Sequence, residues 1–135
     1  MRAFVDTSAL LALSHARDQY HKRAAALARD HHASGGRYLG STLILSEFHS
    51  HLLYLRGPAS ALATLTTLLG DPAHQWRPVS SELVHDAKAN WLARYPDQRF
   101  SLADAVSFEI MTRERLTHAF AFDRHFEVAG FRLLG

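Results

Sequence analysis

Short runs of aromatic and β-branched residues alternate along the chain with longer amphipathic segments, and this alternation predicts the secondary structure. The opening run, Arg2 to Val5, is typical of a buried strand, and at Asp6 it changes into an alanine- and leucine-rich helical segment. Further strands are expected at residues 37–40, 76–79, 118–122 and 131–134. Because proline has no amide hydrogen to donate, Pro78 confines the 76–79 strand to the margin of a sheet.

Helical segments fill the intervals between these strands. After the short helix that follows Asp6, capping residues, glycines and prolines predict helices over 24–33, 43–56, 59–69, 83–92 and 101–113. The 43–56 and 59–69 helices are expected to form a hairpin, and the 101–113 helix is apolar on nearly every side and should be buried. Strands that alternate with helices indicate a mostly parallel, twisted sheet covered on both faces. We therefore expect an α/β fold, a three-layer α/β/α domain formed by residues 1–135 as a single unit.

Composition narrows the class of protein. The chain has 135 residues, of which 47% are hydrophobic and 21% charged, as in an ordinary globular domain. It contains no cysteine, which excludes disulfides and thiolate metal sites. Neither a signal peptide nor an apolar stretch of membrane-spanning length is apparent, so we expect a soluble, cytoplasmic protein. The formal net charge of +2 permits a nucleic-acid partner without arguing strongly for one.

Four acidic residues occupy positions that a solvated surface explains poorly. Asp6 and Asp123 each follow a predicted buried strand, and Asp104 lies in the first turn of the buried 101–113 helix. Glu47 belongs to a helix that begins after another strand end, and its spacing places it on the arc expected to face the core, with Leu43, Ile44, Tyr54 and Leu55. Because ligands bind at the carboxyl ends of strands in open α/β sheets, these four carboxylates can converge on one site.

Each acid also has a structural explanation when it is taken alone. Asp6 is a favoured N-cap, Ser101 and Asp104 have the spacing of a capping box, and Asp123 can cap the turn that follows it. Glu47 can pair with His51, one helical turn further along. The functional interpretation therefore depends on the combination of all four residues.

Four carboxylates gathered in one place require a cation. Two of them about 4 Å apart repel by roughly 4 kcal/mol at an effective dielectric near 20. Oxygen donors without cysteine suit Mg²⁺, or Mn²⁺, and the usual second participant at such a site is a substrate phosphate. Zinc is disfavoured because the close histidine pairs, His31-His32 and His49 with His51, do not share a helix face; we interpret them as surface residues or weak RNA contacts.

Several arginines flank the two later acids. They are either phosphate ligands or ordinary solvated charges, and solvation is the commoner role for any one of them. The arginines concerned are Arg94, Arg99, Arg113, Arg115 and Arg124.

The segments that carry these acids resemble the PIN-domain nucleases, and most closely the VapC-type ribonuclease toxins of toxin–antitoxin pairs. The matching segments are residues 4–10, 41–47, 101–105 and 122–126, in the order in which the family has them. The resemblance implies a Mg²⁺-dependent endoribonuclease whose four acidic positions are Asp6, Glu47, Asp104 and Asp123. It implies that the three aspartates bind metal directly or through water, and that Glu47 is a ligand or the base that orients a water. The hydroxyl beside the first aspartate falls on Thr7 or Ser8, and the match leaves this choice open.

The resemblance further implies protein partners. These are a cognate antitoxin, whose tail occupies the active site, and a second copy of the chain in a homodimer. Two other classes of function remain as alternatives. One is a different Mg²⁺-dependent phosphohydrolase, which would favour a D-x-D pair that the sequence lacks, and the other is a non-catalytic binding module on the same fold.

Overall fold

A five-stranded, all-parallel sheet forms the centre of the molecule in the computed structural model, which describes residues 1–135. The strand order is β3-β2-β1-β4-β5, so β3 lies at an edge, as Pro78 predicted. The strands are β1 (Arg2–Val5), β2 (Arg37–Ser41), β3 (His74–Arg77), β4 (His118–Phe120) and β5 (Arg132–Leu133). β3 ends just before the proline, and β4 and β5 are shorter than the sequence predicted.

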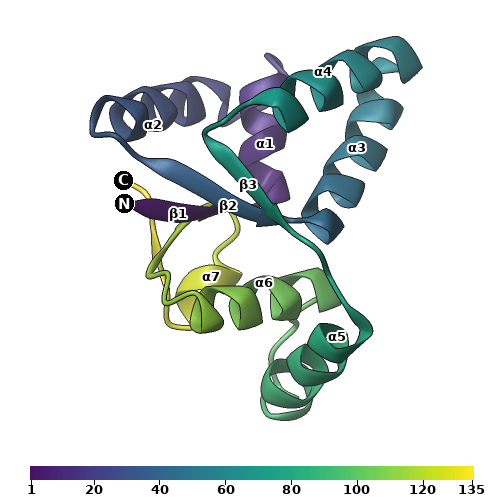
Figure 1. The fold of residues 1–135 in the computed structure, drawn as a ribbon, viewed down its shortest axis with the longest axis vertical. Helices are drawn as coiled ribbons and strands as arrows, with labels where there is room; N and C mark the ends of the chain where they lie inside the picture. Colours follow the sequence, from purple (N-terminus) through teal and green to yellow (C-terminus); the bar gives the residue numbers. More distant parts are fainter.

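Helices cover both faces of the sheet, which confirms the predicted three-layer α/β/α architecture (Figure 1). One face carries α1 (Thr7–Ser14), α2 (His21–Ala33), α3 (Thr42–Arg56) and α4 (Pro58–Gly70), with α3 and α4 forming the expected hairpin. The opposite face carries α5 (Ser81–Ala87), the π-helical segment η1 (Lys88–Ala93), α6 (Leu102–Arg113) and α7 (His125–Val128). None of these helices combines the length and apolar character needed to cross a membrane.

The path of the chain creates a crevice between β1 and β4. From β1 the chain proceeds outward to β2 and β3, with its connecting helices on one face. It then returns across the other face to β4 and β5. The loops that leave the carboxyl ends of β1 and β4 therefore diverge, and such a point is where open α/β sheets bind their ligands.

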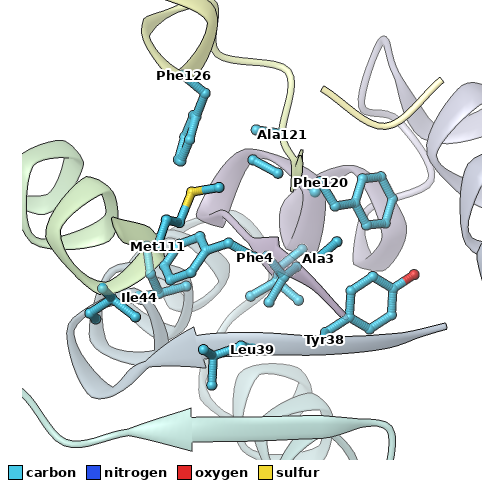
Figure 2. Close-up of a cluster of buried hydrophobic side chains, with 14 of the residues drawn as sticks. Ala3, Phe4, Tyr38, Leu39, Ile44, Met111, Phe120, Ala121 and Phe126 are labelled. Atoms are coloured by element: carbon cyan, nitrogen blue, oxygen red, sulfur yellow. The ribbon is translucent and has the colours of Figure 1, made fainter. Parts of the chain in front are cut away.

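The core is centred on β1, and Figure 2 shows Phe4 and Leu39 among its buried side chains. In the sheet, Phe4 is in register with Leu39 of β2 and with Ala119 of β4. Every residue of α6 from Asp104 to Met111 is buried, as its apolar sequence predicted. Gly40 permits close packing inside the sheet, because a Cβ atom built there would lie 2.4 Å from the ring of Trp76. This core fixes the positions of the residues that follow β1 and β4.

The helix expected over 83–92 is present as α5 followed by the π-helical segment η1. Two other local predictions were wrong. The turn expected after Asp123 contains the one-turn helix α7. His31 is buried rather than on the surface, with its Nε2 2.9 Å from the carbonyl oxygen of Arg37. Burial of His31 follows from its position at the end of α2, where it packs against Tyr38.

Candidate active site

The acidic residues singled out from the sequence lie around one cleft of about 380 Å³ at the carboxyl ends of β1 and β4. Asp6, Glu47, Asp104 and Asp123 all line it. The remaining lining residues are Thr7, Ser8, Leu11, His51, Arg99, Ser101, Ala103 and His125. Folding thus brings together acidic side chains as distant in the sequence as Asp6 and Asp123.

Asp6 stands at the junction of β1 and α1. Its amide donates a hydrogen bond to the carbonyl oxygen of Phe120 at 3.0 Å, which ties the end of β1 to β4. Its carboxylate caps α1 by accepting from the amide of Ser8 at 3.2 Å and from the Ser8 hydroxyl at 2.6 Å. The N-cap interpretation of Asp6 is therefore correct, and the same carboxylate also lines the cleft.

Burial dominates the electrostatics of Asp6, which is 8% exposed. It raises the pKa of the carboxyl group from its usual 3.8 to about 6, because water no longer solvates the charged form. The hydrogen bonds from Ser8 oppose this rise in pKa, and the charges of Asp104 and Asp123 add to it. Asp6 forms no ion pair with a lysine, arginine or histidine of the chain.

Asp104 has the predicted capping role, and its side chain also lines the cleft. Its carboxylate accepts from the amide of Ser101 at 3.0 Å, while its own amide donates to the Ser101 hydroxyl at 3.0 Å, which completes a capping box for α6. The same Oδ2 atom lies 2.9 Å from Nδ1 of His125. The capping box holds the Asp104 carboxylate at the cleft wall.

Asp123 completes the aspartate set on the β4 side. Its Oδ1 accepts from the amide of His125 at 2.9 Å and lies 3.4 Å from Nδ1 of the same residue. Ligand atoms of Asp104, Asp123 and His125 lie within 4.8 Å of one another, a spacing that one metal ion could bridge. The carboxylates of Asp6, Asp104 and Asp123 line the same cleft and supply the oxygen donors that a hard divalent cation prefers, whereas the His125 imidazole is a softer donor that contacts two of these carboxylates.

Glu47 lies in the cleft, but the predicted reason for its position was wrong. The buried stripe of α3 consists of Ile44, Phe48 and Leu52, whereas Tyr54 and Leu55 are exposed. Glu47 is half-buried at the border of this stripe, because it is one position away from Phe48 and one turn from Ile44. No ion pair joins Glu47 to His51, so the predicted structural pair is absent.

Both hydroxyl groups beside Asp6 support a carboxylate. Thr7 donates from Oγ1 to Oε1 of Glu47 at 3.0 Å, which links α1 to α3 across the cleft. Ser8 donates to Asp6 and accepts from the amide of Phe122 at 3.0 Å, directly before Asp123. The sequence left open whether Thr7 or Ser8 supports the site; in the structure Thr7 contacts Glu47 and Ser8 contacts Asp6.

Sequence reasoning missed His125 as a functional candidate. The residue was treated as part of a turn, although its position two residues after Asp123 was the available signal. Of the five arginines considered as phosphate ligands, Arg99 lines this cleft, while Arg113 pairs with Asp86 and Glu109 outside it. Arg124 lines a neighbouring cleft.

The fold and the acidic cleft together define a nuclease of the PIN type, and the PIN domain family matches residues 3–132 of the chain. The chain therefore belongs to the PIN-domain family, which is a family of metal-dependent nucleases. It is 31% identical over 132 residues to the 23S rRNA-specific endonuclease VapC20 of Mycobacterium tuberculosis strains CDC 1551 / Oshkosh and ATCC 25618 / H37Rv. That alignment covers 95% of this chain and 94% of the relative.

Solved structures give the same result for the fold. The crystal structure of Mycobacterium tuberculosis VapC20, described as a sarcin-ricin loop cleaving toxin, superposes with a TM-score of 0.82 at 31% identity, covering 96% of this chain and 95% of that one. VapBC2 from Rickettsia felis, bound to a DNA fragment from its promoter, superposes with a TM-score of 0.70 over 98% and 97% of the two chains. At 11% identity the second likeness shows the fold alone. The predicted membership of the VapC-type PIN nucleases is confirmed.

Proposed function

We propose that this protein is a Mg²⁺-dependent endoribonuclease and the toxin of a type II toxin–antitoxin pair that acts in the cytoplasm. The observation that carries the proposal is the convergence of four carboxylates on one cleft in which none is paired with a lysine or arginine. Their mutual repulsion is relieved when a divalent cation binds. Mn²⁺ would satisfy the same donors.

Asp6, Asp104 and Asp123 would hold the metal, and Glu47 would be a further ligand or would orient the attacking water. A bound Mg²⁺ would supply Lewis-acid activation of the scissile phosphate and of a water molecule. Each of the four carboxylates accepts a hydrogen bond that limits its rotation: from Ser8 to Asp6, from Thr7 to Glu47, from Ser101 to Asp104, and from the amide of His125 to Asp123. Such preorganisation keeps the charges in position before the substrate arrives.

We also propose a substrate and partners for this chain. Its 31% identity to VapC20 over nearly the whole length supports ribosomal RNA, and specifically the sarcin-ricin loop of 23S rRNA, as the RNA that it cleaves. Membership of the VapC type supports a cognate antitoxin that occupies the acidic cleft, and a homodimer of the toxin.

Incubation of the purified protein with total cellular RNA and Mg²⁺, followed by mapping of the fragment ends, tests the proposal. Discrete cuts are expected, and they should disappear with EDTA and in Asp6→Asn. A cut within the sarcin-ricin loop would support the proposed substrate. Cuts at other sites would support the endoribonuclease activity but reject the sarcin-ricin loop as its target. Absence of any cut, or cuts that persist in Asp6→Asn, would contradict the nuclease function.

A Mg²⁺ titration distinguishes this function from the two alternatives. A catalytic metal site should bind Mg²⁺ in the wild type and lose it in Asp104→Asn. A non-catalytic binding module would show the same metal affinity in both proteins. Metal binding together with hydrolysis of small phosphate esters, but not of RNA, would indicate another phosphohydrolase.

A further inference from the structure

A second cleft, of about 430 Å³, adjoins the acidic one. It lies between the beginning of α2, which contributes Tyr20 and Arg23, and the segment that contains β5, which contributes Arg132. Phe122 and Arg124 line its side towards the acidic cleft. We call this second cavity the arginine cleft, because three of its lining residues are arginines.

The two clefts share the segment that follows β4. Phe122 and Arg124 line the arginine cleft, while Asp123 and His125 line the acidic cleft. Since consecutive Cα atoms are about 3.8 Å apart, a molecule bound to Asp123 is within reach of the arginine cleft. The amide of Phe122 donates to the same Ser8 hydroxyl that holds Asp6, so the two clefts have a fixed relative position.

An aromatic pair lines the arginine cleft. The rings of Tyr20 and Phe122 stack in parallel, with centroids 4.6 Å apart and planes 2° apart. Tyr20 is 40% exposed, and its amide is held by Oδ1 of Asp18 at 2.8 Å. A fixed, partly exposed aromatic surface of this kind suits stacking against an unpaired nucleic-acid base.

The charges of the arginine cleft favour a polyanion. Arg23 and Arg132 are exposed and form no ion pair. Arg124 forms one long ion pair, in which its Nε atom lies 3.9 Å from Oε1 of Glu127. Glu127 is also the only acidic side chain that lines this cleft. Guanidinium groups without carboxylate partners are available to phosphate oxygens, which they bind in a bidentate manner.

We infer that the arginine cleft binds the RNA strand next to the cleaved phosphodiester, with its arginines on phosphates and the Tyr20–Phe122 pair against a base. This inference rests on the proposed nuclease function and adds a substrate-binding subsite to it. An acidic peptide would satisfy the arginines, but it would leave the exposed aromatic surface without a planar partner. RNA offers phosphates to the arginines and bases to the aromatic pair.

Binding can be measured in an Asp6→Asn background, in which the RNA stays intact, with a short synthetic RNA that spans the mapped cut. Arg23→Ala and Arg132→Ala should each weaken binding several-fold and reduce the slope of log affinity against log salt by about 1. Tyr20→Ala should weaken binding by about tenfold without changing that slope, and Tyr20→Phe should restore it because the ring is retained. Arg29→Ala, an exposed arginine of α2 outside the cleft, is the matched control and should leave binding unchanged.

The corresponding kinetic experiment uses proteins with Asp6 intact. The arginine substitutions should raise KM for the RNA and leave kcat nearly unchanged, because the cleft contacts the substrate away from the reacting atoms. The inference is overturned if Arg23→Ala and Arg132→Ala bind RNA with the affinity and salt dependence of the parent, even though the wild type cleaves RNA. Loss of antitoxin binding with unchanged RNA binding would likewise overturn it in favour of a protein partner. Failure of the wild type to cleave any RNA would instead reject the proposed function itself.

Discussion

Two groups of acids at opposite ends of α6 differ in how the protein treats their charge. At the beginning of the helix, Asp104 faces the cleft that it shares with Asp6 and Asp123, and no lysine or arginine pairs with any of them. Towards the other end, Glu109 accepts from Nε of Arg113 at 3.0 Å and from Nδ2 of Asn90 at 3.0 Å. The carboxylates therefore have only the imidazole of His125 as a basic partner in one region, and an arginine in the other.

Glu114 shows the consequence of pairing most clearly. The hydrogen bond and charge of Arg77, 2.6 Å away, lower the pKa of Glu114, with a smaller contribution from Arg2. Desolvation moves the pKa of Asp6 in the opposite direction. Glu109 and Glu114 are therefore paired with arginines of the chain, whereas the cleft acids have no lysine or arginine partner, as expected if they bind the proposed external cation.

The largest expected difference between the two regions concerns RNA cleavage. Asp104→Asn should lower the cleavage rate by about 10³-fold, which corresponds to roughly 4 kcal/mol, because a proposed metal ligand is lost. Asp97→Asn, an exposed acid of the preceding loop, is the matched control and should cleave normally. Measurement of initial rates at saturating Mg²⁺ tests this, and equal rates for Asp104→Asn and the wild type would remove Asp104 from the site.

The pH dependence of stability should have opposite signs in the two regions. In metal-free protein the pKa of Asp6 is about 6 when folded and near 3.8 when unfolded, so the folded state binds the proton more tightly. The stabilisation by neutral Asp6 is complete below the unfolded value and is lost as the pH rises through the folded value. Its loss should lower the free energy of unfolding by about 3 kcal/mol.

Urea unfolding in EDTA from pH 4 to pH 7 can measure this contribution. Asp6→Asn should remove the decline in stability that is due to Asp6, while an identical decline in that variant would refute the assignment. Glu114, whose pKa is lowered, should behave in the reverse way: its stabilisation is present above its unfolded pKa and is lost as the pH falls. Glu114→Gln should therefore flatten the acidic limb of the same profile.

A smaller effect is expected at Glu109, whose side chain is 9% exposed. Glu109→Gln keeps the size of the side chain but removes the charge that pairs with Arg113, and should cost about 2 kcal/mol of folding stability. RNA cleavage should remain within about twofold of the wild type after correction for the folded fraction, because Glu109 does not line the cleft. Loss of cleavage in well-folded Glu109→Gln would show that the two regions are not independent.

The smallest expected effect concerns Ser8. Ser8→Ala leaves the amide of Phe122 without its acceptor and should cost about 1 kcal/mol of stability. Because the Ser8 hydroxyl also lowers the pKa of Asp6, that pKa should rise above its present value of about 6, which NMR titration in EDTA can follow. Ser46→Ala, an exposed position on α3, is the control, and an unchanged Asp6 pKa in Ser8→Ala would contradict the proposed support.

Local patterns were enough to predict Asp6 and Asp104, because both capping roles depend on residues within three positions along the chain. Glu47 was selected correctly but for the wrong reason. Helical spacing shows which residues share a face of α3, but it does not show which face is buried. Tertiary packing buries the face with Ile44, Phe48 and Leu52, and leaves Tyr54 and Leu55 exposed. The contact between Thr7 and Glu47 joins two helices, so no local pattern could have predicted it.

The amino-acid sequence by itself determined the alternation of strands and helices, the parallel sheet and the acids that end its strands, because periodicity and capping act over a few neighbouring residues. Only the tertiary structure decided that His125 contacts Asp104, that the Ser8 hydroxyl bonds to both Asp6 and Phe122, and that an arginine cleft adjoins the acidic one. These relations depend on how the ends of β1 and β4 are brought together. That arrangement is fixed by packing across the whole core, and no short stretch of the chain contains it.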